Sequence, residues 1–215
     1  MIALLNDAII MKKLIRIIIF LAILVVVGFK SVYFKKLDEM QTSEGSGLDV
    51  SAYTASYFKE LKPMLDSSVN VVTLYQALKN KDLSLIKSNA HSLSLGSLKY
   101  IMVSGQGIVA KVDSGSVIIN AIAKDLVEPV YIETEFIFGN AVRDASGIVK
   151  LSDFTNTTDL NNVSSEINKT IRETVVKPFI STVQKGDTVS FNGAIEVNEK
   201  YLNVSDLQVM PIRLK

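Results

Sequence analysis

The hydrophobic pattern of this chain changes its period near Lys99, and no other feature constrains the fold as strongly. Within residues 49–90, apolar side chains recur every three or four positions, as they do on the buried face of a helix. From residue 100 onward, apolar and polar residues alternate instead, as they do along a strand with one buried face. The sequence therefore predicts an α+β fold in which short helices precede a β-rich part.

Three short helices are expected ahead of the strands. Pro63 should end the first of them, because proline removes a backbone donor and clashes with the preceding turn. Asp82 has the side chain of an N-cap for the third. Tyr53, Tyr57 and Tyr75 form an aromatic stripe, and packing between helices explains this stripe more simply than a ligand surface does.

The β-rich part has five expected strands, with one long helix after the third. The strands are expected at residues 100–112, 117–121, 130–138, 189–197 and 207–211. Between the third and the fourth, apolar residues from Leu160 to Val175 keep a helical spacing. This order is that of an OB-like five-stranded β-barrel. Gly105 and Gly107 should interrupt and bend the first strand, and Pro211 suits a strand at the edge of a sheet.

An apolar run from Ile17 to Phe29 has lysines on both sides. As a helix it would be about 20 Å long, shorter than the ~30 Å hydrocarbon core, although flanking residues can extend it. The alternatives are a cleaved signal peptide, a retained signal anchor and a buried helix of a cytosolic protein. Since no Ala-x-Ala pattern follows the run, the retained transmembrane anchor is favoured. The positions expected to face the membrane are Ile17, Phe20, Leu24 and Val27.

The composition excludes several kinds of site and partner. The chain of 215 residues contains no cysteine, which rules out disulfides, thiolate metal sites and a cysteine nucleophile. Residues 1–36 carry six Lys or Arg and one Asp, so the other 17 basic and 21 acidic residues give the remainder a net charge of −4. A mildly acidic body argues against nucleic acid as a partner, because a phosphate backbone requires clustered positive charge. No metal or cofactor site is expected.

The densest cluster of polar residues lies between the third strand and the long helix, over residues 139–156. Its candidate ligand-binding residues are Arg143, Asp144, Asp153, Phe154 and Asn156. Arginine, asparagine and an aromatic ring together suit a sugar or another small polar ligand. The same residue types also fix loops through ion pairs and helix caps, so a structural role is the alternative.

The residues that could support catalysis are few. His91 stands alone, and no nucleophile-elbow pattern surrounds the neighbouring serines. Glu133 and Glu135 lie two positions apart on one expected strand face, roughly 7 Å from each other, in the range used for acid–base work on sugars. A solvent-facing strand is expected to carry charges in any case. A hydrolase is therefore kept only as a third alternative, and no catalytic residue is predicted.

Several longer runs together resemble one bacterial family. They are "VSGQGIVAKVD", "FIFGNAVRDA", "LSDFTNTTDLNNVSSEINKTI", "KGDTVSFNGAIEV" and "LQVMPIRL". In their order and spacing they resemble the predicted periplasmic lipoproteins of domain of unknown function 2291. The resemblance implies a helical domain followed by an OB-like barrel, a location outside the cytoplasm and an accessory role beside sugar ABC transporters. It supplies no reaction and no site residues, and the cysteine that carries the lipid in many members is absent here.

These observations predict four segments. They are a signal anchor over residues 1–36, a polar tether over 37–48, a small helical domain over 49–97 and the OB-like barrel over 98–215. The predicted function is that of a non-catalytic binding or accessory module, held at the inner membrane of a bacterial cell with its body in the periplasm. Its expected partners are the membrane and either a sugar or an ABC-transporter component. The alternative is a structural envelope domain that contacts only other proteins.

Overall fold

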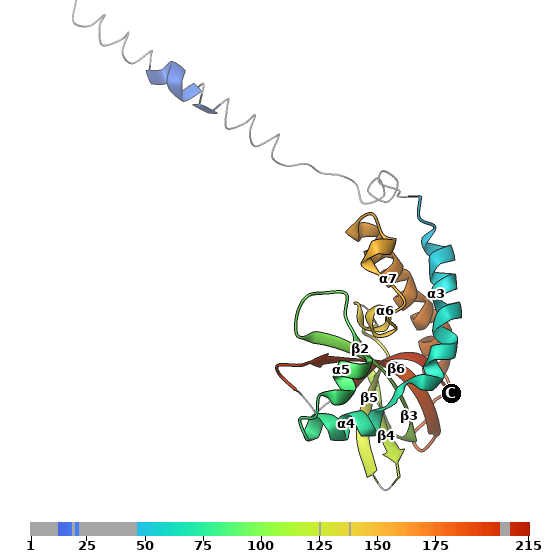
Figure 1. Cartoon of the computed structure of the whole chain (residues 1–215). Coiled ribbons are helices and arrows are strands. Elements are labelled where there is room, and N and C mark those ends of the chain that lie inside the picture. The colour runs from blue at the N-terminus through green and yellow to red at the C-terminus, as the bar shows by residue number, and fades with distance from the viewer. Residues whose placement is uncertain (1–12, 19, 22–46, 125, 138, 203–206) are drawn as a thin grey trace, which may run out of the picture. The chain divides into compact units, whose positions relative to one another are not determined.

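The structure is a computed structural model of the chain, and it describes residues 13–18, 20–21, 47–124, 126–137, 139–202 and 207–215. The chain divides into two compact units, residues 1–45 and 46–215 (Figure 1). In the first unit the described residues are helical, and Ile17 and Phe20 are 59% and 64% exposed. Leu24 and Val27, the other two expected membrane positions, lie outside the described residues. Within the described ranges, no helix has the length and hydrophobicity needed to cross a bilayer.

The second unit is built of helices and strands. Its helical elements are α3 (Val50–Met64), η1 (Leu65–Ser67), α4 (Val71–Lys79), α5 (Ser84–Asn89), α6 (Ala141–Ala145), η2 (Leu151–Asp153), α7 (Thr157–Ile171), the π-helical turn η3 (Arg172–Val176) and α8 (Lys177–Ile180). Its strands are β1 (Val69–Asn70), β2 (Ala90–His91), β3 (Leu98–Val112), β4 (Ser116–Ala123), β5 (Leu126–Glu133), β6 (Thr188–Asn198) and β7 (Leu207–Leu214).

Five of these strands pair in a closed ring. Hydrogen-bonded neighbours follow the order β3–β4–β5–β7–β6, and β6 pairs again with β3. All of these pairs are antiparallel except β5–β7, which is parallel over the short stretch from Val130↔Leu207 to Ile132↔Val209. The helices α6, α7 and α8 come between β5 and β6 in the chain. The expected order of five strands with a helix after the third is therefore confirmed. The two-residue strands β1 and β2, which the sequence did not predict, pair with β3.

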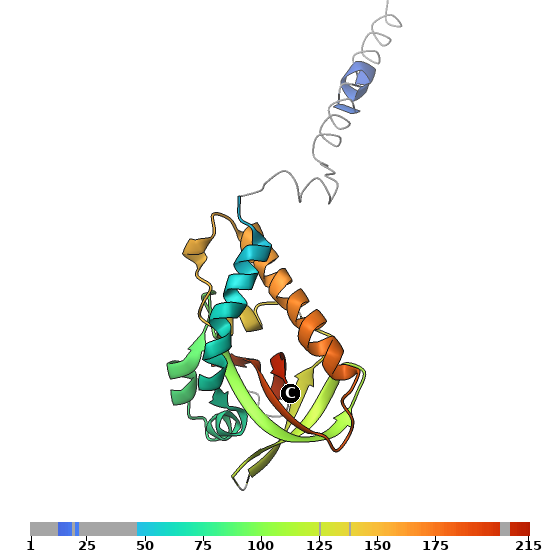
Figure 2. The same ribbon diagram turned by 90° about the vertical axis from the view of Figure 1, so that its right-hand side faces the viewer.

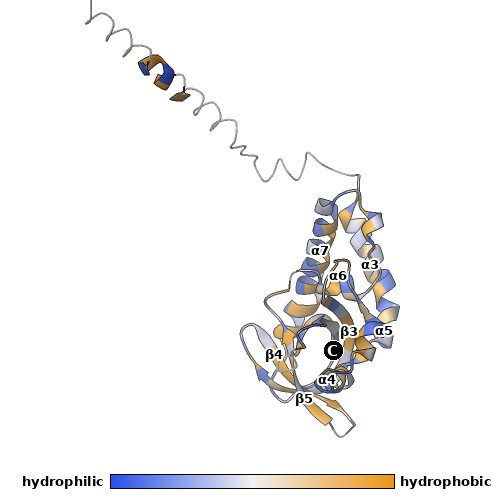
Figure 3. Cartoon of the chain, turned by 60° about the vertical axis from the view of Figure 1, so that its left-hand side comes forward, coloured by the Kyte–Doolittle hydropathy of each residue, from blue (hydrophilic) through white to orange (hydrophobic). Residues whose placement is uncertain are grey.

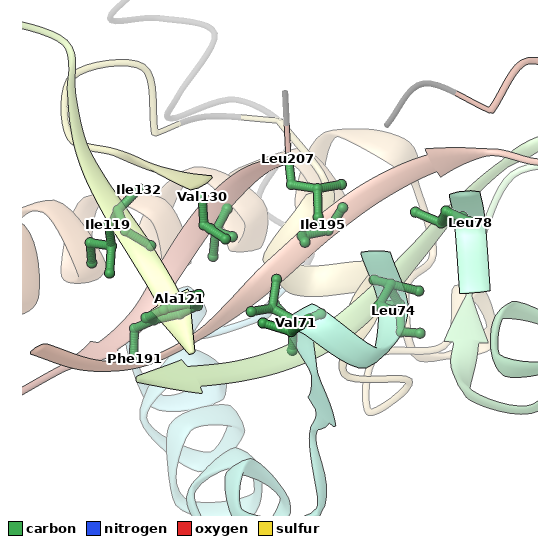
Figure 4. Close-up of a cluster of buried hydrophobic side chains, with 14 of the residues drawn as sticks. Val71, Leu74, Leu78, Ile119, Ala121, Val130, Ile132, Phe191, Ile195 and Leu207 are labelled. Atoms are coloured by element: carbon green, nitrogen blue, oxygen red, sulfur yellow. The ribbon is translucent and has the colours of Figure 1, made fainter. Parts of the chain in front are cut away.

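The interior of the ring is filled by alternate strand residues and covered by α4. Ile119 and Val130, from neighbouring strands, are completely buried there. Val71 and Leu74 of α4 are also completely buried in this cluster, and Figure 4 shows them beside the strand residues. Asn70 begins α4 by accepting hydrogen bonds from two backbone N–H groups of its first turn. The helix expected to belong to a separate domain thus contributes directly to the core of the ring.

A second core covers part of the outer face of the ring. Tyr100 and Met102 alternate with the inward residues of β3 and are buried beneath α3, α6 and α7. The helices α3 and α7 lie side by side, as Figures 1 and 2 show from two directions. Tyr57 of α3 and Ile167 of α7 are almost completely buried in this core. The first half of β3 is therefore covered on both faces, whereas its second half is covered only from inside.

The first ring strand differs from its expected form. β3 continues from Leu98 to Val112 without interruption, and its register shift lies between Val109 and Lys111 instead of at the glycines. A Cβ atom on Gly107 would lie only 2.0 Å from the backbone oxygen of Asn120. This glycine is therefore required for the close approach of two strands, and it does not end one.

Three further expectations need correction or refinement. β5 ends at Glu133, so the alternation that the sequence shows through residue 138 does not continue as a strand. Pro211 is not on an edge strand, because β7 pairs with both β5 and β6; the proline lies beyond the last β5 partner, Val209, where a missing donor costs little on that side. The long helix passes through the π-helical turn Arg172–Val176 shortly before Pro178, whose ring cannot accommodate a regular preceding turn.

Candidate functional site

The five polar and aromatic residues that the sequence analysis selected fall into two groups with different surroundings. Arg143 and Asp144 belong to α6 and are only 4% and 3% exposed. Asp153, Phe154 and Asn156 surround the start of α7, where Asp153 and Asn156 are exposed and Phe154 is half-buried. The structure therefore does not bring the five side chains to one common surface.

Arg143 and Asp144 form an ion pair that is fully engaged inside the protein. Arg143 Nε donates to Asp144 Oδ1 at 2.7 Å, and its Nη1 donates to Ser164 Oγ at 2.8 Å. The other oxygen of Asp144 accepts a hydrogen bond from the backbone N–H of Leu93. The hydroxyl of Ser164 in turn donates to the carbonyl oxygen of Leu160. This network ties α6 to α7 and to the segment that follows β2, which is what a structural ion pair does.

The second group holds the loop before α7 against α3. Asp153 accepts hydrogen bonds from the Tyr53 hydroxyl at 3.2 Å and from the backbone N–H of Lys150 at 3.2 Å. The rings of Tyr53 and Phe154 are tilted against each other, with their centroids 5.4 Å apart. Asn156 is the N-cap of α7 and accepts a hydrogen bond from the backbone N–H of Asp159. Burial, followed by the negative charge of Asp153, raises the pKa of Tyr53 to about 12. Each of these contacts holds the loop before α7 in place.

A cleft of about 500 Å³ lies next to α6, between the ends of β6 and β7. The side chains that line it include Tyr100, Glu196, Asn198, Tyr201 and Gln208. Apolar core residues of β6 and β7 also contribute to the lining. A concave surface of this size that combines aromatic rings, amides and one carboxylate has the character of a site for a small ligand.

The cleft exists because two neighbouring strands diverge. β6 and β7 pair from Phe191↔Leu214 to Ala194↔Met210, and beyond that point β6 pairs only with β3. Ser190 exchanges both of its backbone hydrogen bonds with Lys215 on the β7 side. Since backbone groups point alternately to the two sides of a strand, the N–H and C=O of Glu196 should also face β7, which has diverged there. The open end of the β6–β7 hairpin thus contributes backbone as well as side-chain polar groups to the cleft.

The two tyrosines of the cleft are held in different ways. The side-chain oxygen of Asn198 accepts hydrogen bonds from the backbone N–H groups of Lys200 and Tyr201, and this turn places Tyr201, 78% exposed, at the mouth. Tyr100 lies deeper and is only 7% exposed. It is directly opposite Glu196 in the β3–β6 register, so the two side chains share a face. Burial, the charge of Glu196 and a hydrogen bond to it raise the pKa of Tyr100 to about 12.

The opposite lip of the cleft is the segment between β5 and α6. Gly139 and Asn140 line the cleft at this lip. Asn168 of α7 donates a hydrogen bond to the Gly139 carbonyl oxygen at 3.0 Å, and Arg172 donates to the carbonyl oxygen of Ile137. Gly139 has a φ of 82°, which glycine adopts without steric strain. The lip is therefore fixed by α7. This is the helix whose N-terminus is capped by Asn156, in the loop that holds the candidate ligand-binding residues.

The sequence analysis did not identify the polar residues of this cleft, although the segment that it selected, residues 139–156, begins at the cleft. Tyr100 and Glu196 are 96 positions apart in the chain, and only the pairing of β3 with β6 makes them neighbours. Tyr201 lies in the loop after the fourth ring strand, where no local pattern marks it. The one available signal was a glutamate at a polar position of the alternating strand Val189 to Val197. That signal has no meaning until the partner strand is known.

The residues considered for hydrolysis lie far apart along the ring. His91 is opposite Tyr100, near the start of β3, whereas Glu133 is opposite Ser116, just beyond the end of β3. Burial raises the pKa of Glu133. Glu135 lies beyond the end of β5, so it is not on the same strand as Glu133. Within the described part of the chain, no group of three or more metal-ligating side chains is close enough to hold an ion.

Comparison with known protein families shows which family this chain belongs to. Residues 22–215 match the family described as "Predicted periplasmic lipoprotein (DUF2291)". The chain belongs to this family. Its description indicates a location in the cell envelope, and the family carries no assigned activity. This DUF2291 chain differs from a lipoprotein in one respect, since it has no cysteine to which a lipid could be attached.

A solved structure supports the fold of this DUF2291 protein. The crystal structure of an OB-fold protein from Thermotoga maritima is similar with a TM-score of 0.70 and 20% sequence identity. The similarity covers 80% of this chain and 99% of the other. At this level of identity the similarity establishes the OB-type fold alone. Among curated protein sequences no match is found.

Proposed function

We propose that this DUF2291 protein is a non-catalytic binding module of the cell envelope that holds a small polar ligand in the β6–β7 cleft. A sugar is the ligand class that we propose first. The observation that supports this proposal is Tyr201, an aromatic side chain that is 78% exposed at the mouth of a cleft whose lining also contains amides and a carboxylate. An aromatic ring with an apolar face, next to groups that both donate and accept hydrogen bonds, suits the mixed surface of a sugar ring.

The proposal includes the N-terminal segment. We propose that the apolar run Ile17–Phe29 is retained as a membrane anchor and that the cleft-bearing unit lies outside the cytoplasm. The missing cysteine favours this form of anchoring, because a lipid cannot be attached in its place. A role beside a sugar ABC transporter would then bring the ligand to a transport protein in the same membrane.

Ligand-observed saturation-transfer NMR with glucose tests the proposed site. Wild-type protein is expected to transfer saturation to the sugar, and Tyr201→Ala should weaken binding about tenfold or more without unfolding the protein, since the side chain is exposed. Leu151→Ala is the matched control, because Leu151 is 54% exposed and does not line the cleft. Absence of transfer from glucose and other neutral sugars, or equal binding by Tyr201→Ala, would contradict the proposal.

A protein-interaction role is the second candidate, and a specific surface favours it. Ile122, Leu126 and Val127, near the end of the β4–β5 hairpin, are 44%, 45% and 56% exposed. The end of this hairpin is correspondingly orange in Figure 3. Exposed aliphatic side chains that are close together often mark contact surfaces. Replacement of Val127 by serine should then abolish cross-linking to an envelope partner in cells while glucose binding stays unchanged; unaltered cross-linking would exclude this surface.

A further inference from the structure

We infer that the β6–β7 cleft selects ligands that carry a positively charged amine, so that an amino sugar binds more tightly than the same sugar with a hydroxyl group. This inference rests on the proposed function of the cleft. It adds the charge of the ligand, which the proposed function leaves open. It depends on Glu196, Tyr100 and Tyr201 and on the absence of cationic side chains from the described lining of the cleft.

Glu196 gives the cleft an unbalanced negative charge. Among the described residues that line the cleft, it is the one Asp or Glu, and these residues include no Lys or Arg. The ion pairs found between described residues do not involve Glu196. Lys99 and Lys200 are close in the chain, but neither lines the cleft.

The nearby buried pair does not cancel this charge. The charges of Arg143 and Asp144 both act on Tyr100, in opposite directions. Because these two residues are 2.7 Å apart and bear opposite charges, together they add little net potential at the cleft. An ammonium group entering the cleft would therefore encounter the field of Glu196.

The two tyrosines add a second preference for a cation. An aromatic ring attracts an ammonium group over its face through its quadrupole. Tyr100 lies directly opposite Glu196 in the β3–β6 register, so its side chain is beside the carboxylate on the same face. Tyr201 at the mouth presents an exposed ring to an entering ligand. A carboxylate that shares its cleft with two aromatic rings, with no competing lysine or arginine in the described lining, is an environment that favours ammonium over a hydroxyl group or an anion.

The experiment compares three sugars that differ only at one position: glucose, glucosamine and N-acetylglucosamine. Affinities are measured by calorimetry at about pH 6, where an aliphatic amine of this kind is protonated. Wild-type protein should bind glucosamine about fivefold to tenfold more tightly than glucose, because Glu196 is partly solvated and its charge is partly screened. N-acetylglucosamine, which lacks the charge, should show no such gain. Added salt should reduce the preference for glucosamine.

Two variants assign the preference to its source. Glu196→Gln should lose the gain, so that glucosamine binds to it no more tightly than glucose does. Glu199→Gln is the matched control, because it removes the same charge three residues away from a side chain that does not line the cleft. It should retain the gain.

The possible results separate this inference from the proposed function. If glucose and glucosamine bind equally, the inference is wrong while sugar binding stands. If glucosamine is preferred and Glu196→Gln keeps the preference, the inference is also wrong, since the amine is then recognised elsewhere. If none of the three sugars binds, the proposed function fails and the inference fails with it.

Discussion

Replacement of Arg143 by methionine should destabilise the protein strongly, because it leaves Asp144 buried without its counter-ion. Both side chains are at most 5% exposed, and their ion pair is 2.7 Å long. Methionine keeps most of the apolar stem, so the lost volume is small. Removing one partner of a buried ion pair costs about 3–5 kcal/mol. Ser164 keeps its own hydrogen bond to Leu160, so its loss of the arginine adds little.

Urea unfolding of wild type and variant measures this cost directly. For a domain of this size, 3–5 kcal/mol corresponds to a fall in Tm of about 6–20 °C. Lys169→Met is the control, since Lys169 makes an exposed ion pair with Glu166 on α7, and its loss should change the free energy of unfolding by less than about 0.5 kcal/mol. The double variant Arg143→Met/Asp144→Leu should recover much of the loss, because it removes the unpaired charge as well.

A different result would change the role assigned to the pair. If Arg143→Met costs less than about 1 kcal/mol and instead abolishes ligand binding, the guanidinium is accessible and acts on a ligand. The ligand-binding interpretation of Arg143 and Asp144 would then be correct, and the network around Ser164 would be incidental.

Three further predictions concern the ring. Ile119→Ala, at a completely buried position, should cost about 2–5 kcal/mol in urea unfolding; a cost below 1 kcal/mol would mean that the interior of the ring is loosely packed. Gly107→Ala should cost about 1–3 kcal/mol, because the new methyl group would meet the backbone of Asn120, whereas Gly47→Ala has open space and should be neutral. The pKa of Tyr100 is raised from 10.0 to about 12 in the folded protein, so the contribution of this tyrosine to stability is complete below pH 10 and is lost as the pH rises toward 12. Tyr100→Phe should therefore show a shallower loss of stability at alkaline pH. An unchanged slope of stability against pH would contradict the raised pKa.

The order of the elements could be predicted from the sequence because it depends on local periodicity. Alternation and helical spacing are properties of neighbouring residues, so five strands and one inserted helix were recognisable without any knowledge of contacts. The cap of α7 was also local, since Asn156 occupies that position. Asp82 was expected to cap the third helix, but the N-cap of α5 is Leu83, and Asp82 accepts a hydrogen bond from the N–H of Ser84 from one residue further back. Errors occurred where a distant partner decides the local geometry. Gly107 was interpreted as an interruption because its function, the close passage of β4, is visible only in the folded chain.

The same limit explains why the candidate site was only half predicted. The segment around α6 was found because polar residues are dense there in the sequence, but density does not distinguish a buried ion pair from a binding surface. Arg143 and Asp144 are hydrogen-bonded to each other, and their other bonds go to Ser164 and to the backbone N–H of Leu93. The cleft beside them depends on the divergence of β6 from β7 and on the pairing that brings Tyr100 to Glu196. Neither feature has a signature in a single stretch of sequence.

The measurement that tests the central claim most directly is a map of amide chemical-shift changes in 15N-labelled protein during titration with glucosamine. The account predicts that the largest changes fall on Glu196, Asn198, Tyr201 and Gln208, which come from both sides of the open hairpin. Changes concentrated instead around Asp153 and Asn156, or an absence of specific changes at saturating sugar, would show that the β6–β7 cleft is not the binding site.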